Sequence, residues 1–320
     1  MINLRFFGFL LGIFGASLAM AADKDGNLTI AFLGQDQGNP ANAVALSGAQ
    51  HAAADLGPTY SVKITVKDFT VASAVPAAQA AAIDNAVKAG VDGITLACAD
   101  ADKVSAAIDR AVAAGIPVAT FDIDAPNSKR FFAYLSDNDQ CGQTLFVELA
   151  KVMGGKGTVA ILAGNVDSEP QQMRIQGAQN ASRLYPEVKI KGVYRTKESS
   201  EDAVRVLAAV SRQNPDITGW LLTGGWPLGV PNALPWAAGT VKCVAVGLLG
   251  DQTRYLHDGQ VQMAVSQPFY QWGYRTVERL CMRIALNRKP ADPIEFASLV
   301  LVTPANVGEF ERQAAEWVAK

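Results

Sequence analysis

The feature that most constrains this 320-residue chain is a regular alternation of short apolar runs with Ala-rich stretches of helical length. Strands that alternate with such helices are typical of βαβ units, in which helices cover both faces of a parallel sheet. A helix over 43–57 is expected to end at Gly57, because glycine tolerates the left-handed conformation that ends many helices. The strands and helices expected in the first part of the chain are, in order, 28–34, 43–57, 61–69, 74–90, 92–98, 101–115 and 117–122.

The same alternation begins again near Phe131. Its expected elements are 132–136, 141–153, 157–164, 173–186, 188–195, 200–215, 219–225 and 241–249. Hydrophobic residues make up 49% of the chain, which favours packed globular structure, and about 300 residues exceed what one core comfortably organises. The sequence therefore predicts an α/β protein of two doubly wound parallel-sheet domains, joined without a Pro/Gly/Ser-rich linker.

The N-terminus has the pattern of a secretory signal. Arg5 precedes an apolar run over 6–19, and Ala19-Met20-Ala21 is a small-residue cleavage site. The run is shorter than the roughly 20 residues of a comfortable membrane span. We therefore expect a signal peptide over residues 1–21 and an exported mature chain, with an uncleaved anchor as the alternative.

Charge and metal-binding residue types exclude several classes. The formal net charge is −2, and the chain has no Lys/Arg run that would neutralise phosphates, so no nucleic-acid partner is expected. With two histidines and no CxxC or HExxH motif, we expect no metal site and no cofactor. Four dispersed cysteines are expected to be free thiols, with one bridged pair as the alternative: Cys98, Cys141, Cys243 and Cys281.

Polar side chains follow two neighbouring strands in the stretch "FDIDAPNSKRFFAYLSDN" (121–138). Asp122 and Asp124 follow one strand, and Asn138 follows the next. In open α/β sheets, ligands bind outside the carboxyl ends of the strands. Two domains with these ends facing each other would form a cleft lined by carboxylates and amides. The cations of this stretch, Lys129 and Arg130, are expected in a solvated outer turn.

Several motifs occur in an order that matches a known family. They are "NP" at 39–40, "AVKAGVDGITL", "AVAAGIPVATFDIDAPNSKR", "YLSDNDQCGQ", "MRIQGA", "GGWPLG" and "VSQPFYQWGY". Together they span nearly the whole mature chain, which resembles bacterial periplasmic sugar-binding proteins of the ribose-binding type, the soluble components of ABC importers. The resemblance implies the Venus-flytrap fold of type 1 periplasmic binding proteins, with three hinge crossings.

The resemblance also implies a division of the chain into two lobes. Hinge crossings are expected near Ser136, Gln267 and Phe296. The predicted N-terminal lobe is 26–135 plus 268–296, and the predicted C-terminal lobe is 136–267 plus 297–320. The implied function is capture of a monosaccharide by hinge closure and its delivery to the membrane permease of an ABC importer. The implied state is a periplasmic monomer.

Sugars present hydroxyls that both donate and accept, so carboxylates, amides and Arg suit them, with aromatic rings against their C–H faces. The predicted ligand-binding residues are Asn39, Asp122, Asp124, Asn138, Arg174, Trp226 and Gln267. Structural alternatives remain open for several of them. Asp122 suits an Asx-turn, Arg174 an exposed helix, Trp226 a partly buried loop and Gln267 the hinge backbone.

Three departures from the family pattern put ribose itself in doubt. "NPANA" lacks an aromatic pair after the proline, and "TGGWPLG" replaces the usual Asn-Asp. Leu248 and Leu249 stand where a carboxylate is usual, and Asp251 is a candidate replacement. Trp226 is a candidate for the missing stacking face.

Catalysis is not expected. Asp122 and Asp124 are spaced to lie on one face of an extended segment, as in a glycosidase pair, but no G-x-S-x-G elbow or nucleotide motif accompanies them. The alternative function is a periplasmic binding protein for a polyol or other small polar signal, serving a sensor or chemoreceptor. A repressor effector domain is disfavoured, because the chain begins with a signal pattern and has no helix-turn-helix.

Overall fold

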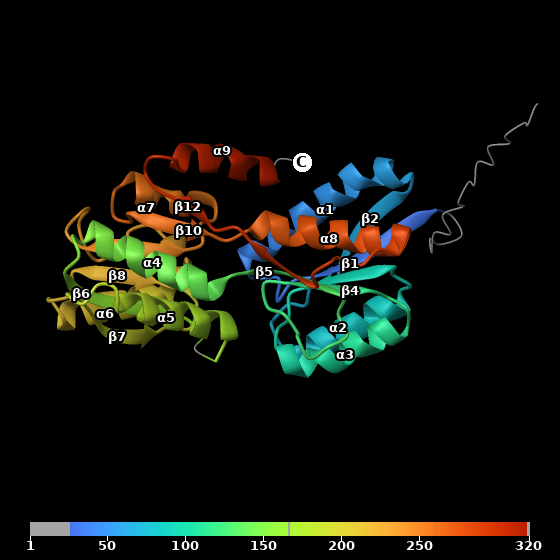
Figure 1. Cartoon of the computed structure of the whole chain (residues 1–320), viewed down its shortest axis with the longest axis horizontal. Helices are drawn as coiled ribbons and strands as arrows, with labels where there is room; N and C mark the ends of the chain where they lie inside the picture. The colour runs from blue at the N-terminus through green and yellow to red at the C-terminus, as the bar shows by residue number, and fades with distance from the viewer. Residues whose placement is uncertain (1–25, 166, 319–320) are drawn as a thin grey trace, which may run out of the picture.

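The computed structural model describes residues 26–318, except for residue 166. The predicted signal peptide lies outside the described residues. Figure 1 shows two lobes side by side, each built on a six-stranded sheet with helices on both faces. Among the described helices, none has both the length and the apolar character needed to span a membrane.

The N-terminal lobe contains a wholly parallel sheet with the order β11-β5-β4-β3-β1-β2. Its strands are β1 (Asn27–Leu33), β2 (Lys63–Asp68), β3 (Gly93–Leu96), β4 (Val118–Phe121), β5 (Phe132–Ser136) and β11 (Ile294–Ala297). Its helices are α1 (Pro40–Tyr60), α2 (Pro76–Lys88), α3 (Ala101–Ala113) and α8 (Phe269–Leu286). One buried cluster joins the sheet to α1 and α8, and a second joins its other face to α2 and α3.

The C-terminal lobe repeats this plan with the order β12-β10-β9-β8-β6-β7, in which β12 alone pairs antiparallel. Its strands are β6 (Gly157–Ala163), β7 (Val188–Arg195), β8 (Gly219–Leu222), β9 (Lys242–Val246), β10 (Met263–Ser266) and β12 (Val300–Val302). Its helices are α4 (Asn138–Val152), α5 (Glu169–Ser182), α6 (Ser200–Gln213), α7 (Arg254–His257), α9 (Val307–Val318) and the short 3-10 turns η1 (Trp226–Gly229) and η2 (Gly250–Thr253).

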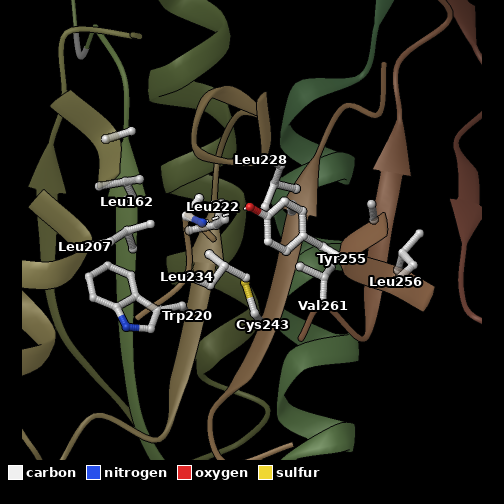
Figure 2. Close-up of a cluster of buried hydrophobic side chains, with 14 of the residues drawn as sticks. Leu162, Leu207, Trp220, Leu222, Leu228, Leu234, Cys243, Tyr255, Leu256 and Val261 are labelled. Atoms are coloured by element: carbon white, nitrogen blue, oxygen red, sulfur yellow. Dashed lines mark hydrogen bonds between the residues drawn. The ribbon is translucent and has the colours of Figure 1, made fainter. Parts of the chain in front are cut away.

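The core beneath α6, α7 and α9 holds the largest buried side chains of this lobe (Figure 2). Trp220 of β8 is fully buried, and Tyr255 of α7 is 2% exposed. The Tyr255 hydroxyl accepts a hydrogen bond from the Ala233 amide at 2.9 Å. This bond satisfies a buried polar group and fixes the loop that follows η1.

The chain passes between the two sheets three times. It crosses after Ser136 of β5, after Ser266 of β10 and after Ala297 of β11. We propose lobe boundaries at these crossings, which lie within two residues of the predicted ones. The three crossings lie close together, because residues of all three line one small cavity.

In each lobe, glycines let two helices approach closely. A Cβ at Gly273 of α8 would lie 1.8 Å from the Ala45 carbonyl oxygen of α1. In the C-terminal lobe, a Cβ at Gly142 of α4 would lie 2.0 Å from the Arg174 carbonyl oxygen of α5. No side chain fits at either distance, so these glycines set the helix spacing and bring the Arg174 backbone against α4.

The first helix is longer than expected. It runs from Pro40 to Tyr60 and continues through Gly57 and Pro58, so the prediction that Gly57 ends it was wrong. Ser61 supplies the left-handed cap, with φ 55°. Gly57 serves close approach instead, because a Cβ there would lie 3.0 Å from the Val62 carbonyl oxygen.

Candidate functional site

A cavity of about 420 Å³ lies between the lobes, at the carboxyl ends of the strands. Its volume falls within the range of roughly 300–1,000 Å³ that is typical of small-molecule sites. Both lobes and the second crossing contribute to it. Its principal side chains are Gln35, Asn39, Asp122, Gln171, Arg174, Glu198, Trp226, Gln252, Gln267 and Phe269.

Asp122 enters the cavity from the N-terminal lobe, directly after β4. Its φ is 58°, a left-handed conformation that Asp tolerates better than most residues, and its amide donates to the Tyr134 carbonyl at 3.3 Å. Burial raises the pKa of its carboxyl to about 6, the positive charge of Arg174 opposes that rise, and Glu198 adds to it. The site therefore holds a carboxyl group whose charge is costly until a partner satisfies it.

Arg174 enters from the C-terminal lobe, on the second turn of α5, and is only 4% exposed. Its Nε donates to Oδ1 of Asn138 at 2.8 Å, and its Nη1 donates to the Thr223 carbonyl at 2.8 Å. These bonds fix the plane of the guanidinium. The alternative of an exposed helix cation does not describe Arg174.

Asn138 does not line the cavity. Its Nδ2 donates to the Ser136 carbonyl at 3.2 Å, and its Oδ1 accepts from Arg174. It begins α4 just beyond the first crossing. The structure thus places it as a positioning residue behind Arg174.

Asp124 lies outside the residues that line the cavity, because it pairs with Arg130. Nε and Nη2 of Arg130 donate to the two carboxylate oxygens of Asp124 at 2.7 and 2.6 Å. Their side chains are 9% (Asp124) and 8% (Arg130) exposed. The expectation that Arg130 occupies a solvated turn was wrong, whereas Lys129 is exposed. A buried carboxylate needs partners, and Arg130 supplies the opposite charge for Asp124.

Asn39 and Gln267 both line the cavity. Oδ1 of Asn39 accepts from the Ala41 amide at 3.0 Å and so caps α1. Gln267 follows β10 at the second crossing, where its Oε1 would lie 3.7 Å from a Cβ at Gly247. Both amides are held where the lobes meet.

Trp226 also lines the cavity, and two glycines make room for its ring. A Cβ at Gly224 would lie 2.4 Å from Cη2 of Trp226, and one at Gly164 would lie 2.6 Å from the same atom. This packing gives a physical reason for the glycine in "TGGWPLG", because any larger residue at position 224 would displace the indole.

The sequence reasoning missed Glu198 and Gln171. Glu198 follows β7, has φ 62°, and accepts a hydrogen bond from the Asn165 amide at 2.8 Å. Gln171 is buried and accepts from the Thr223 hydroxyl at 2.5 Å. Applying the strand-end rule to β7, as was done for β4, would have identified Glu198.

Asp251 does not replace the missing carboxylate at the cavity. Its side chain is 86% exposed and pairs with Arg254. Leu249 and Gln252 line the cavity in its place. Gln252 donates to the Gly225 carbonyl at 3.3 Å and accepts from the Leu249 amide at 2.9 Å, so it joins two loops of the cavity wall.

The described residues contain no group of three or more His, Cys, Asp or Glu side chains that could hold a metal ion. All four cysteines are free and buried. Burial raises the pKa of the Cys141 thiol to about 11, which keeps it protonated and unreactive. The site offers hydrogen-bonding groups, charges and an aromatic ring.

Comparison with known proteins identifies the family. A model of the periplasmic binding protein domain matches residues 30–286. A solute-binding protein of an ABC transporter from Burkholderia graminis, in complex with D-arabinose, is similar in structure with a TM-score of 0.81 and 23% identity, over 89% of this chain and 98% of that one.

Two further solved structures share the fold. A sugar-binding protein of a sugar ABC transporter from Bacillus halodurans has a TM-score of 0.79 and 21% identity, over 89% of this chain and 100% of that one. A periplasmic solute-binding protein from Actinobacillus succinogenes, with bound D-allose, has a TM-score of 0.79 and 22% identity, over 88% and 100%. With the matched domain covering most of its length, this chain belongs to the periplasmic binding protein family.

Proposed function

We propose that this chain is an exported, monomeric solute-binding protein that captures a monosaccharide between its lobes and delivers it to the permease of an ABC importer. The observation that carries the proposal is that Asp122 of one lobe and Arg174 of the other line a single cavity. The similar structures that bind D-arabinose and D-allose support the sugar class. The pairing of Asp124 with Arg130 removes Asp124 from the possible acid–base pair with Asp122.

The roles of the site residues follow from their donors and acceptors. Asp122 would accept hydroxyl hydrogens, and Arg174 would donate to hydroxyl oxygens from the opposite lobe. Gln267 and Asn39 would supply amide groups at the hinge and the N-terminal lobe, and the indole of Trp226 would cover a C–H face of the sugar. Asn138 would help indirectly by holding the guanidinium of Arg174 in place. Asp124 would help indirectly by stabilising the loop after β4 through its pair with Arg130.

Hinge closure follows from this division of contacts. A ligand that touches both lobes binds the closed arrangement better than the open one, so its binding shifts the population toward closure. The closed arrangement would then present a composite surface of both lobes to the permease. Small-angle scattering should show a smaller radius of gyration when the sugar is bound.

The direct test is a thermal-shift screen of the purified protein against pentoses, hexoses, deoxysugars and polyols, with D-arabinose and D-allose included. A ligand at about 100 times its dissociation constant adds roughly 2.7 kcal/mol to the free energy of unfolding, which is a readily measured rise in Tm. One or a few sugars should raise the Tm. No shift across the panel would refute the sugar-binding proposal.

The Arg174→Ala variant connects that result to this cavity. A hydrogen bond from a charged donor such as Arg174 typically contributes about 1.5–3 kcal/mol, so affinity measured by calorimetry should fall by roughly tenfold or more. A variant that remains folded by circular dichroism and binds as tightly as the wild type would remove Arg174 from the site.

A further inference from the structure

The charged side chains of the cavity are unequal in number. Among the described residues that line it, Asp122 and Glu198 are acidic and Arg174 is basic, which leaves a formal charge of −1. The two acids come from opposite lobes. They are near enough to interact, since Glu198 contributes to the raised pKa of the Asp122 carboxyl.

Arg174 is already committed to the protein at two of its nitrogens. It donates to Asn138 and to the Thr223 carbonyl, both from within the C-terminal lobe. It can still donate to a ligand, and it keeps its positive charge, because both acceptors are neutral amide oxygens. Glu198, in contrast, is exposed in the cleft. Its Oε1 accepts a hydrogen bond from the Asn165 amide.

Four α-helix N-termini among the described residues supply lining residues of the cavity. The N-termini of α5 and α8 have no side-chain cap, whereas those of α1 and α6 are capped. Asn39 accepts from the Ala41 amide at the start of α1, and Ser199 accepts from the Asp202 amide at the start of α6. Capping uses amide hydrogens that would otherwise attract an anion. The helix ends therefore offset the acidic charge only in part.

Glu198 lies beside the aromatic ring of Trp226. A Cβ at Gly164 would lie 2.1 Å from Oε1 of Glu198 and 2.6 Å from Cη2 of Trp226, so both side chains pack over the same glycine. A carboxylate next to an indole is a combination that suits a protonated amine, which the ring attracts through its negative face and the carboxylate through its charge. Asp122 faces this pair from the other lobe.

Building on the proposed function, we propose that the preferred ligand is a sugar that carries a protonated amine, and that Glu198 is the residue that determines this preference. The amine would lie between Glu198 and Asp122, against the face of Trp226, while Arg174 and the amides bind hydroxyls. The site then ranks an amino sugar above its neutral parent, and the neutral parent above the corresponding uronic acid.

The test is calorimetry with two matched series, which are D-glucosamine, D-glucose and D-glucuronate, and their galactose counterparts. A cation at a partly exposed aromatic and carboxylate site gains a factor of roughly 3–10 in affinity, so one amino sugar should bind tighter than its parent by that factor. If in neither series the amino sugar binds more tightly than its neutral parent, while a neutral sugar does bind, the inference is overturned and the proposed function stands. No binding by either series or by the wider panel would refute the proposed function itself.

The Glu198→Gln variant isolates the residue. It removes the charge and keeps the size, so the ratio of amino-sugar to neutral-sugar affinity should fall toward one. Glu201→Gln is the matched control, because Glu201 is an exposed acid on α6 that does not line the cavity. If this affinity ratio falls equally in both variants, or falls in neither variant, the role of Glu198 is refuted.

Salt dependence gives a second measurement, made on the wild-type protein. Raising the salt from about 0.05 M to about 0.5 M shortens the Debye length several-fold and should lower the amino-sugar preference. A preference that does not change with salt would contradict its electrostatic origin.

Discussion

Arg130 donates two hydrogen bonds, of 2.7 and 2.6 Å, to the carboxylate of Asp124. The side chain of Arg130 is 8% exposed and that of Asp124 is 9% exposed. Oδ1 of Asp124 also accepts from the Thr120 hydroxyl at 2.5 Å. The pair links the end of β4 to the turn that leads into β5. It thereby holds the loop that begins with Asp122, so Asp124 serves the site through backbone position.

Breaking this pair should destabilise the protein. Removing one member of a buried ion pair typically costs about 3–5 kcal/mol, because the other charge is left without a partner. We expect Arg130→Ala to lower the free energy of unfolding by that amount in urea denaturation. Arg110→Ala is the control, since Arg110 forms a similar two-bond pair with Asp84 on the surface and its loss should change little. Equal effects of the two substitutions would contradict the structural role of Arg130.

The sequence predicted the architecture well because the alternation of strands and helices is a local pattern. Periodicity predicts the apolar strands, such as β1 and β8, and the helices between strands. The second lobe follows because that pattern repeats. The pairing of Asp124 with Arg130 was not legible in the same way. It depends on how the loop between β4 and β5 folds back on itself, which hydrophobic periodicity does not encode.

Asp122 should make the ligand-free protein less stable at neutral pH. Its pKa is raised from 3.8 to about 6, so between about pH 4 and pH 6 the folded state holds a proton that the unfolded state has released. The stability that this proton supplies is complete below about pH 4 and is lost as the pH rises through about 6. Asp122→Asn avoids the loss, and Asn tolerates the φ of 58°.

We therefore expect Asp122→Asn to have a higher Tm than the wild type at pH 7, with the difference shrinking toward pH 4. Its affinity for the sugar should fall, because a carboxylate acceptor is lost. Thermal melts without ligand across this range measure the first effect, and calorimetry measures the second. A wild-type protein that is the more stable of the two at pH 7 would contradict the cost assigned to the buried charge.

Gly224 should be required for the position of Trp226. A Cβ there would lie within 2.4 Å of the indole, so Gly224→Ala should displace the ring, shift the tryptophan fluorescence of the protein and weaken sugar binding. Gly308→Ala is the matched control. Gly308 lies in α9, and no atom lies within 4 Å of the position a Cβ would take. Alanine there should therefore raise the free energy of unfolding by about 0.5–1 kcal/mol and leave binding unchanged. Unaltered fluorescence and affinity in Gly224→Ala would contradict the requirement for glycine at position 224.

The site was partly predictable for a related reason. Asp122 and Arg174 belong to recognisable motifs at a strand end and a helix start, and both line the cavity. Glu198 and Gln171 were missed because no motif marks them, and their place depends on which strands of the second sheet end beside the first lobe. Asn138 is the opposite case, because a motif marks it but it does not line the cavity. Its partner is Arg174, which only the folded chain brings to it.

The last described turn of α9 joins the two lobes at a place separate from the hinge. Val307 and Phe310 pack in the core of the C-terminal lobe, whereas the Trp317 ring stacks on Tyr270 of α8 at 6.0 Å and 19°. The Trp317 carbonyl accepts a hydrogen bond from Ser47 of α1. Figure 1 shows α9 reaching from its own lobe toward α1 and α8.

This contact should favour the arrangement in which both lobes line one cavity. An aromatic pair contributes about 0.5–1.5 kcal/mol beyond the area it buries, so Trp317→Ala should weaken sugar binding roughly two- to tenfold without touching the ligand. Scattering from the ligand-free variant should show a larger radius of gyration. Leu184→Ala, which truncates a side chain that is 73% exposed, is the control and should change neither quantity. Because the stacking bridges the lobes, a Trp317→Ala variant that binds as tightly as the wild type would show that closure does not depend on α9.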